Sequence, residues 1–196
     1  MTIKSDKIMT RKRIFKLLSI IIALLIMPLQ SVAATPPYSN SLSVSRSQQE
    51  KSNWCWAACA KMVGNYMGYS YSQNSIVNYV KGSTADIGAS ASEVCSALAY
   101  ATNNTYYTST VVPPSMSSVK TQIDSAIPIV MRMDWTSGGS HNVVVKGYTD
   151  ATKLIVVDPG VGCSSIMSYE YSDLQSGTWI LSGHGRCTNL YWLIHR

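Results

Sequence analysis

The spacing of apolar residues changes near the middle of the chain and divides the sequence into two halves. Between residues 54 and 126, apolar positions recur three and four residues apart, between Ser, Asn and Gly residues typical of helix ends. One stretch, Ser90-Ala91-Ser92-Glu93, has the spacing of a capping box. The pattern predicts helices over 54–67, 72–82, 90–101 and 118–126.

From residue 127 onward, apolar and β-branched residues form short runs bounded by Gly, Pro, Ser or Asp, which is typical of β-strands. Helices followed by strands, rather than alternating with them, predict an α+β fold with the two kinds of element in separate layers. The predicted strands cover 127–133, 142–148, 154–158, 165–171, 178–181 and 190–194.

The start of the chain has the pattern of an export signal. Six Lys or Arg residues precede an apolar run from Leu17 to Leu29, and small residues follow at 32–34. This order predicts a secretory signal peptide over residues 1–34, cleaved at Ala33 or Ala34, and a secreted or periplasmic protein. The run is shorter than the roughly 20 residues of a membrane span, so we expect no stable membrane association after cleavage. An uncleaved anchor is the alternative.

Removal of the leader changes the charge of the chain. The formal net charge is +6, of which residues 1–34 contribute +5 and residues 35–196 only +1. The basic composition therefore implies no nucleic-acid partner. The polar stretch 35–48 lacks periodicity and predicts a flexible, exposed tail. Residues 49–196 suffice for one domain with a substantial core, which we expect to be a monomer.

The candidate chemistry begins at Cys55, at the predicted start of a helix. All five cysteines follow the leader, and an exported chain usually oxidises cysteines in pairs, which leaves one thiol over. The N-terminus of a helix stabilises a thiolate. Cys55 is therefore the candidate nucleophile, and the alternative is a buried structural thiol or half of a disulfide.

A cysteine nucleophile needs a base, and His141 stands at the start of a predicted strand. If a tight turn at 149–152 pairs that strand with the next one, residue 148 faces residue 153, and Asp158 comes to the same end of the hairpin as His141. The Asp158 carboxylate would then orient the imidazole. Gln49, six residues before Cys55, would direct a side-chain N–H at the oxyanion of the reaction.

Other interpretations of these residues remain open. Asp158 precedes Pro159 and Gly160, where an aspartate is also an ordinary turn residue. His184 lies in a Gly-rich loop and is the alternative base. Gln48 stands next to Gln49 and would exchange roles with it after a shift of one residue.

Taken together, Gln49, the Cys55-Trp56-Ala57 segment and His141 resemble the motifs of papain-like cysteine peptidases. The details are closest to compact bacterial branches, namely the bacteriocin-leader peptidase-like proteins and the plant-pathogen effector proteases. The resemblance covers 49–160 and implies a helical lobe and an antiparallel β lobe with the active site between them. The segments that carry it are Asn53-Trp54-Cys55-Trp56-Ala57-Ala58, Ser140-His141-Asn142-Val143-Val144-Val145 and Val157-Asp158-Pro159-Gly160.

The resulting hypothesis is an exported thiol peptidase that hydrolyses a protein or peptide substrate through a Cys55–His141–Asp158 triad and a thioester acyl-enzyme. We expect no cofactor and no metal, because no His/Cys cluster has zinc spacing. The same triad would serve an acyl transferase or a peptidoglycan amidase. A non-catalytic secreted interaction module is the third alternative.

The four cysteines other than Cys55 allow three disulfide pairings, and the sequence does not choose among them. The location of Cys163 and Cys187 in the β half favours a bridge between them, with Cys59 then paired to Cys95.

Overall fold

The computed structural model describes residues 39–196, so the expected signal peptide lies outside the described residues. In this range the chain forms one α+β unit, as the sequence predicted. No helix in the described range is both long enough and apolar enough to span a bilayer.

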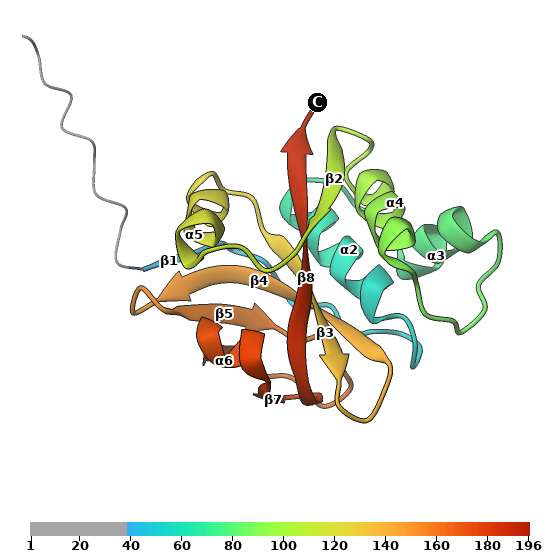
Figure 1. The fold of residues 1–196 in the computed structure, drawn as a ribbon. Coiled ribbons are helices and arrows are strands. Elements are labelled where there is room, and N and C mark those ends of the chain that lie inside the picture. The colour runs from blue at the N-terminus through green and yellow to red at the C-terminus, as the bar shows by residue number, and fades with distance from the viewer. Residues whose placement is uncertain (1–38) are drawn as a thin grey trace, which may run out of the picture. The chain divides into compact units, whose positions relative to one another are not determined.

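Three helices form the N-terminal layer: α2 (Cys55–Tyr66), α3 (Gln73–Lys81) and α4 (Ala91–Ala101). Ser72 and Ser90 cap α3 and α4, since each accepts a hydrogen bond from the third backbone N–H of its helix. Helix α2 begins after Trp54 without a side-chain cap, so the expected cap from Ser52 or Asn53 is wrong. The capping box of Ser90 and Glu93 is complete. Helix α2 packs against α3 and α4 on one side and against the sheet on the other (Figure 1).

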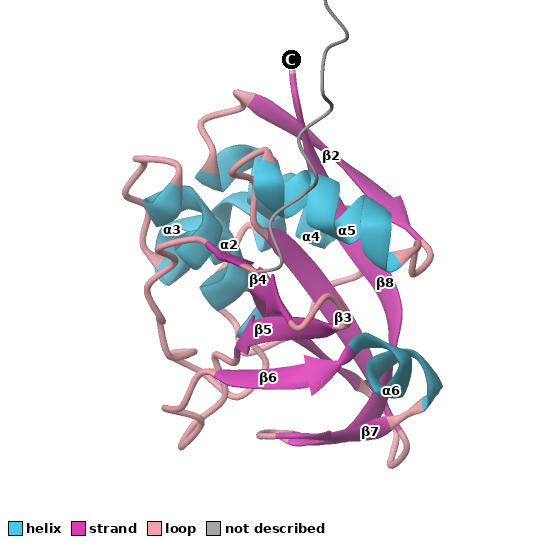
Figure 2. Cartoon of the chain, turned by 90° about the vertical axis from the view of Figure 1, so that its left-hand side faces the viewer, coloured by secondary structure: helices cyan, strands magenta, loops and turns pink. Residues whose placement is uncertain are grey.

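The β layer is an antiparallel sheet whose central path runs β2-β8-β3-β4-β5-β6, with β1 added to β4 and β7 added to β8. Helices α5 (Met116–Asp124) and α6 (Tyr171–Ser176) belong to this part of the fold (Figure 2). The strands are β1 (Asn40–Ser41), β2 (Tyr106–Val111), β3 (Ile129–Trp135), β4 (Ser140–Thr149), β5 (Lys153–Val157), β6 (Met167–Glu170), β7 (Thr178–Ile180) and β8 (Gly183–His195).

The β4–β5 hairpin sets the register that the active site needs. Next to the turn, Lys153 pairs with Thr149 and not with residue 148, the partner that the sequence predicted. A register shift between Val145 and Gly147 then restores the predicted register, so that Val144 pairs with Val157. The far end of the hairpin, where His141 and Asp158 lie, therefore has the alignment that the sequence predicted.

The segment before residue 49 differs from the expected exposed tail over the part that the structure describes. Strand β1 pairs with β4, and Leu42 and Val44 are buried in the core. The alternation Ser41-Leu42-Ser43-Val44-Ser45 directs the two apolar side chains to one face. Residues from 40 onward thus pack on the sheet as part of the domain.

Gly64 lets α2 and α4 approach closely, and its replacement tests this packing. A Cβ at residue 64 would lie 2.5 Å from the carbonyl oxygen of Ala101, which is backbone and cannot rotate away. Gly→Ala within a helix normally stabilises, but we expect Gly64→Ala to lower the free energy of unfolding by about 1–3 kcal/mol, measured by urea denaturation. Gly88→Ala is the control, because nothing lies within 4 Å of its added Cβ. Equal stability of both variants would contradict the close contact.

Candidate active site

Cys55 is the first residue of α2, and its side chain is only 7 % exposed. The N–H groups of a first helical turn have no acceptor within the helix, so they face the sulfur region with their positive ends. The neighbouring indoles fix the approach to this turn. Trp54 donates to the carbonyl oxygen of Ala85 at 2.9 Å, and Trp56 donates to that of Ile87 at 3.2 Å.

His141 and Asp158 are in direct contact, as the hairpin register implied. His141 Nε2 lies 2.8 Å from Asp158 Oδ1, and both residues are buried. The indole of Trp135 stacks on the imidazole, with ring centroids 5.5 Å apart and planes inclined by 17°. The imidazole is thus held both by a carboxylate at its edge and by an aromatic ring on its face.

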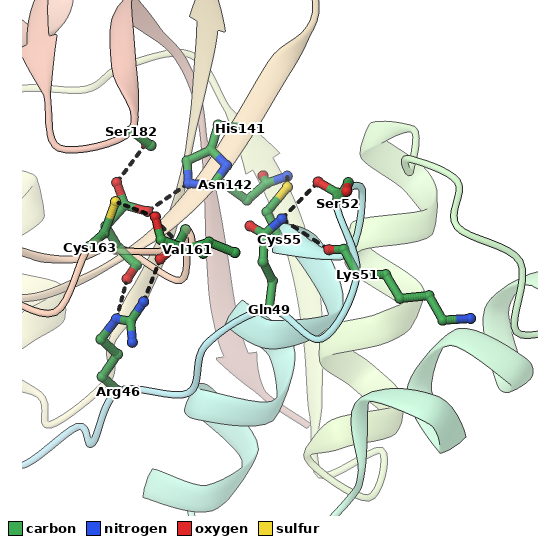
Figure 3. Close-up of polar contacts among 12 residues, drawn as sticks. Arg46, Gln49, Lys51, Ser52, Cys55, His141, Asn142, Val161, Cys163 and Ser182 are labelled. Carbon is green, nitrogen blue, oxygen red and sulfur yellow. Dashed lines mark hydrogen bonds and ion pairs between the residues drawn. The ribbon is translucent and has the colours of Figure 1, made fainter.

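The Asp158 carboxylate is itself fixed by other donors. The Gly160 backbone N–H donates to Oδ1 at 2.8 Å, and the Ser182 hydroxyl donates to Oδ2 at 2.6 Å (Figure 3). Burial alone would raise the pKa of Asp158, but the bonds from His141, Ser182 and Gly160 lower the pKa overall. Asp158 is therefore an anion that can hold a cation beside it.

Cys55 lies within hydrogen-bonding reach of His141, and the two groups shift each other's protonation. Burial opposes ionisation of the thiol, but the interactions with His141 and Asn142 lower the pKa of Cys55. Burial would also lower the pKa of His141, yet the contacts with Asp158 and Cys55 raise it to about 9. Both shifts favour a thiolate beside an imidazolium.

Gln49 is buried beside Cys55, but its amide nitrogen does not face an open oxyanion site (Figure 3). Its Nε2 donates to the carbonyl oxygens of Lys51 and Ser52, at 3.0 and 2.7 Å. Its Oε1 is buried without a hydrogen-bond partner. Both N–H groups of the Gln49 amide thus already donate hydrogen bonds. One of these two bonds has to break before the amide can donate to an oxyanion.

Two further residues contact the site although the sequence motifs did not single them out. The Asn142 amide nitrogen lies 3.7 Å from Cys55 Sγ, a long contact that sulfur still accepts. Arg46 donates through Nε to the carbonyl oxygen of Asp158 at 2.7 Å, and through a second nitrogen to that of Gly160. Arg46 lies in the segment expected to be a tail, and no sequence motif around it indicates a role.

The other two histidines are engaged elsewhere. His184 lies beside Thr136 and packs edge-on against Trp179. His195 contacts Tyr106 near the C-terminus. Both sets of contacts lie outside the His141–Asp158 pair, which favours His141 over His184 as the base.

The expected disulfides are not supported. All five cysteines, which lie in the described range, are free thiols. Cys163 lies in the loop after Asp158 and approaches the carbonyl oxygen of Val161, whereas Cys187 lies in β8 near that of Asn189. Burial raises the pKa of Cys59, of Cys163 and, to about 12, of Cys187. These three thiols are therefore less reactive than Cys55.

A cleft of about 640 Å³ opens beside Cys55 and His141. One wall comes from the loop at Gly88–Ser90, which the two indoles hold in place, and the other from the turn at Gly138–Ser140. Such a groove, with the Cys55 thiol in its lining and small residues on both walls, suits an extended chain. No group of three or more potential metal ligands occurs among residues 39–196.

Comparison with solved structures identifies the fold. The peptidase domain of Streptococcus ComA, a bifunctional ABC transporter involved in quorum sensing, is similar with a TM-score of 0.58 and 17 % identity, over 78 % of this chain and 99 % of that one. A double glycine motif protease from an AMS/PCAT transporter, solved with its leader peptide, has a TM-score of 0.55 and 15 % identity, over 80 % and 95 %.

The fold is thus that of a papain-like cysteine peptidase. Residues 41–185 match the model of the Peptidase_C39 like family, so the chain belongs to that family and is a cysteine peptidase. The resemblance seen in the sequence is confirmed. No curated protein matches the chain in sequence.

The pH dependence of alkylation tests the ion pair. Because the pKa of Cys55 is lowered, its thiolate persists at pH values where an ordinary thiol is protonated. We expect iodoacetamide to label Cys55 with a pH profile displaced to lower pH than that of free cysteine. Replacement of His141 by Ala removes the imidazolium and should move the profile to higher pH. Identical profiles for the two proteins would contradict the pairing; Cys55→Ala supplies the background labelling.

Arg46 is expected to act as a positioning residue, because it bonds to the backbone that carries the Asp158 carboxylate. In Arg46→Ala the Asp158 carbonyl loses this donor, while the Gly160 carbonyl keeps only the Cys163 N–H, and we expect kcat to fall about tenfold with little change in KM. The Cys55 labelling profile should shift to higher pH as the triad loosens. Arg46→Lys should recover part of the activity, since it keeps one donor. A loss of thermal stability with unchanged kcat would assign Arg46 a structural role only.

Proposed function

We propose that this chain is an exported peptidase that hydrolyses peptide bonds through Cys55, His141 and Asp158, with a thioester acyl-enzyme as intermediate. The observation that carries the proposal is the position of His141, whose ring contacts the Asp158 carboxylate at 2.8 Å and interacts with the Cys55 sulfur. The three groups have complementary charges and meet at the base of a cleft.

In the first half of the reaction, the Cys55 thiolate attacks the carbonyl carbon of the scissile bond, and the carbonyl oxygen becomes an oxyanion. As the tetrahedral intermediate collapses, the C–N bond breaks and the His141 imidazolium protonates the departing amine. Asp158 keeps the ring oriented and stabilises its positive charge. The product of this half is a thioester at Cys55 and a neutral imidazole.

In the second half, water takes the place of the departed amine. His141 removes a proton from the water, whose oxygen attacks the thioester carbon. The C–S bond then breaks, the carboxylic acid leaves and the thiolate–imidazolium pair is restored. No cofactor enters the balance of either half.

The oxyanion needs donors that are already oriented when its charge develops. The backbone N–H of Cys55, at the start of α2, is one donor that requires no movement. We assign the second to Gln49 Nε2, which would exchange its bond to the Lys51 or Ser52 carbonyl for one to the oxyanion. The buried, unpartnered Oε1 supports a mobile amide here, because the present orientation leaves one polar atom unsatisfied.

A peptide is the substrate class that the findings favour. The neighbouring double glycine motif protease was solved with a leader peptide, and the cleft here is similarly suited to an extended chain. The leader pattern at 1–34 supports export to the periplasm or the medium. The near-neutral charge of residues 35–196 gives no general attraction to an anionic partner.

Cleavage of casein and of a peptide library by the protein lacking residues 1–34 tests this mechanism. We expect Cys55→Ala to abolish cleavage and Asp158→Asn to lower kcat by roughly 10²–10⁴. Gln49→Ala should cost about 10²–10³ in kcat, the loss typical of one oxyanion donor. Cys95→Ala is the matched control, because Cys95 contacts Thr110 on the far side of α4 and should keep full activity. Cleavage retained by Cys55→Ala would reject the mechanism.

The acyl acceptor separates the peptidase from an acyl transferase with the same triad. Mass spectrometry of the products, with and without an added primary amine, shows whether the acyl group goes to water or to the amine. Cell-wall fragments in the same assay test a peptidoglycan amidase. The peptidase predicts carboxylic acid products from peptides under all these conditions.

A further inference from the structure

Apart from the Cys55–His141 pair, the residues that line the cleft in the described structure include one charged side chain, Arg132. Its strand, β3, pairs with β4, and Arg132 lies directly opposite Asn142. Residues opposite each other in an antiparallel pair direct their side chains to the same face of the sheet. Asn142 reaches Cys55 Sγ from that face, so Arg132 lies on the cleft side of the sheet, close to the nucleophile.

The guanidinium of Arg132 has hydrogen-bonding capacity left for a ligand. Its Nε bonds to Asp134 Oδ1 at 2.7 Å, and its side chain remains 25 % exposed. Asp134 is more exposed than Arg132 and is not among the residues that line the cleft. A guanidinium has five N–H donors, so the bond to Asp134 and the interaction with Tyr191 still leave donors for a ligand.

A second observation at the same place also indicates a missing partner. Asn142 is 3 % exposed, lines the cleft, and its Oδ1 is buried with no hydrogen-bond partner. Buried oxygens of this kind are normally satisfied, so a donor from a bound chain fits here. The main-chain N–H of a peptide supplies such a donor, while the Arg132 side chain next to it offers N–H groups to an acceptor.

We propose that Arg132 and Asn142 form a subsite for a substrate residue with a carboxylate side chain, close to the scissile bond. The Arg132 guanidinium binds the carboxylate and Asn142 Oδ1 accepts a main-chain N–H. A bound peptide removes water from the N–H groups of Arg132 that Asp134 does not bind, which favours a carboxylate that accepts from them. A Lys or Arg side chain at this position meets the same charge and is excluded. This inference names the substrate class and rests on the proposed function.

The test is a set of quenched fluorescent peptides that differ at one position at a time, with Glu, Gln, Leu or Lys placed at each position around the bond that the wild-type protein cuts. At one position, we expect the wild-type kcat/KM to be about tenfold higher for Glu than for Gln, the size of one charge-assisted hydrogen bond. The preference for Glu over Lys should be larger still.

Replacement of Arg132 then assigns the preference to this residue. Arg132→Gln should bring the Glu-to-Gln ratio close to one, and Arg132→Glu should reverse the order so that Lys is preferred. Each ratio is measured within one protein, so a smaller folded fraction does not alter it. Arg186→Glu is the control for the general field of the protein, because this exposed residue lies on β8 opposite Asp134 and does not line the cleft. Its ratios should match those of the wild type.

The outcomes separate the subsite from the function on which it rests. The subsite alone is overturned if the wild type cleaves peptides with no acidic preference at any position. It is also overturned if Arg132→Glu leaves an acidic preference unchanged. If Arg186→Glu changes the Glu-to-Lys preference as much as Arg132→Glu does, the subsite is overturned as well. If the wild type cleaves no peptide at all, while Cys55 is free to react with iodoacetamide, the proposed function fails and the subsite fails with it.

Discussion

A buried charge is the constraint on which the rest of this structure depends. The Cys55 sulfur is nearly enclosed, and enclosure alone would keep it protonated. The pKa of Cys55 is nevertheless lowered, because His141 and the Asn142 amide contact the sulfur. The start of a helix at Cys55 favours the thiolate further. The imidazolium in turn needs the Asp158 carboxylate. Each charge in the series is stable only while its neighbour is held in place, so the fold has to fix all three.

The two layers divide that task. The helical layer supplies the sulfur, and the buried indole of Trp56 ties α2 to one wall of the cleft. The sheet supplies His141 and Asp158 from the end of one hairpin. The bulge near Lys146 matters here, because a shift of one residue along β4 relative to β5 would direct His141 to the opposite face. A single irregularity in the strand therefore decides whether the charges meet.

The sequence patterns predicted those residues of the site whose positions depend on one helix or one hairpin. The start of α2 follows from the spacing of its apolar residues, since no side chain caps this helix. The alignment of His141 with Asp158 follows from a turn and two apolar runs. Arg46 and Ser182 were missed because they reach the Asp158 loop from segments distant in sequence, which only the tertiary fold brings together. Pairing of an odd number of cysteines was a poor guide, since all five are free. Cys55 differs from the other cysteines in its interaction with His141, and the number of cysteines gives no information about that interaction.

The unsatisfied atoms around the sulfur show what the site still lacks. Gln49 Oε1 and Asn142 Oδ1 are both buried without partners, and both side chains lie beside Cys55. A protein interior normally avoids such acceptors, since each costs about 1–3 kcal/mol. Under the proposed mechanism, an extended peptide brings N–H donors to this cleft, and Gln49 exchanges a bond to one of its two carbonyls for a bond to the oxyanion. The Asn142 acceptor would thus be better satisfied with a bound chain than without one, whereas only a contact made with the oxyanion lowers the barrier.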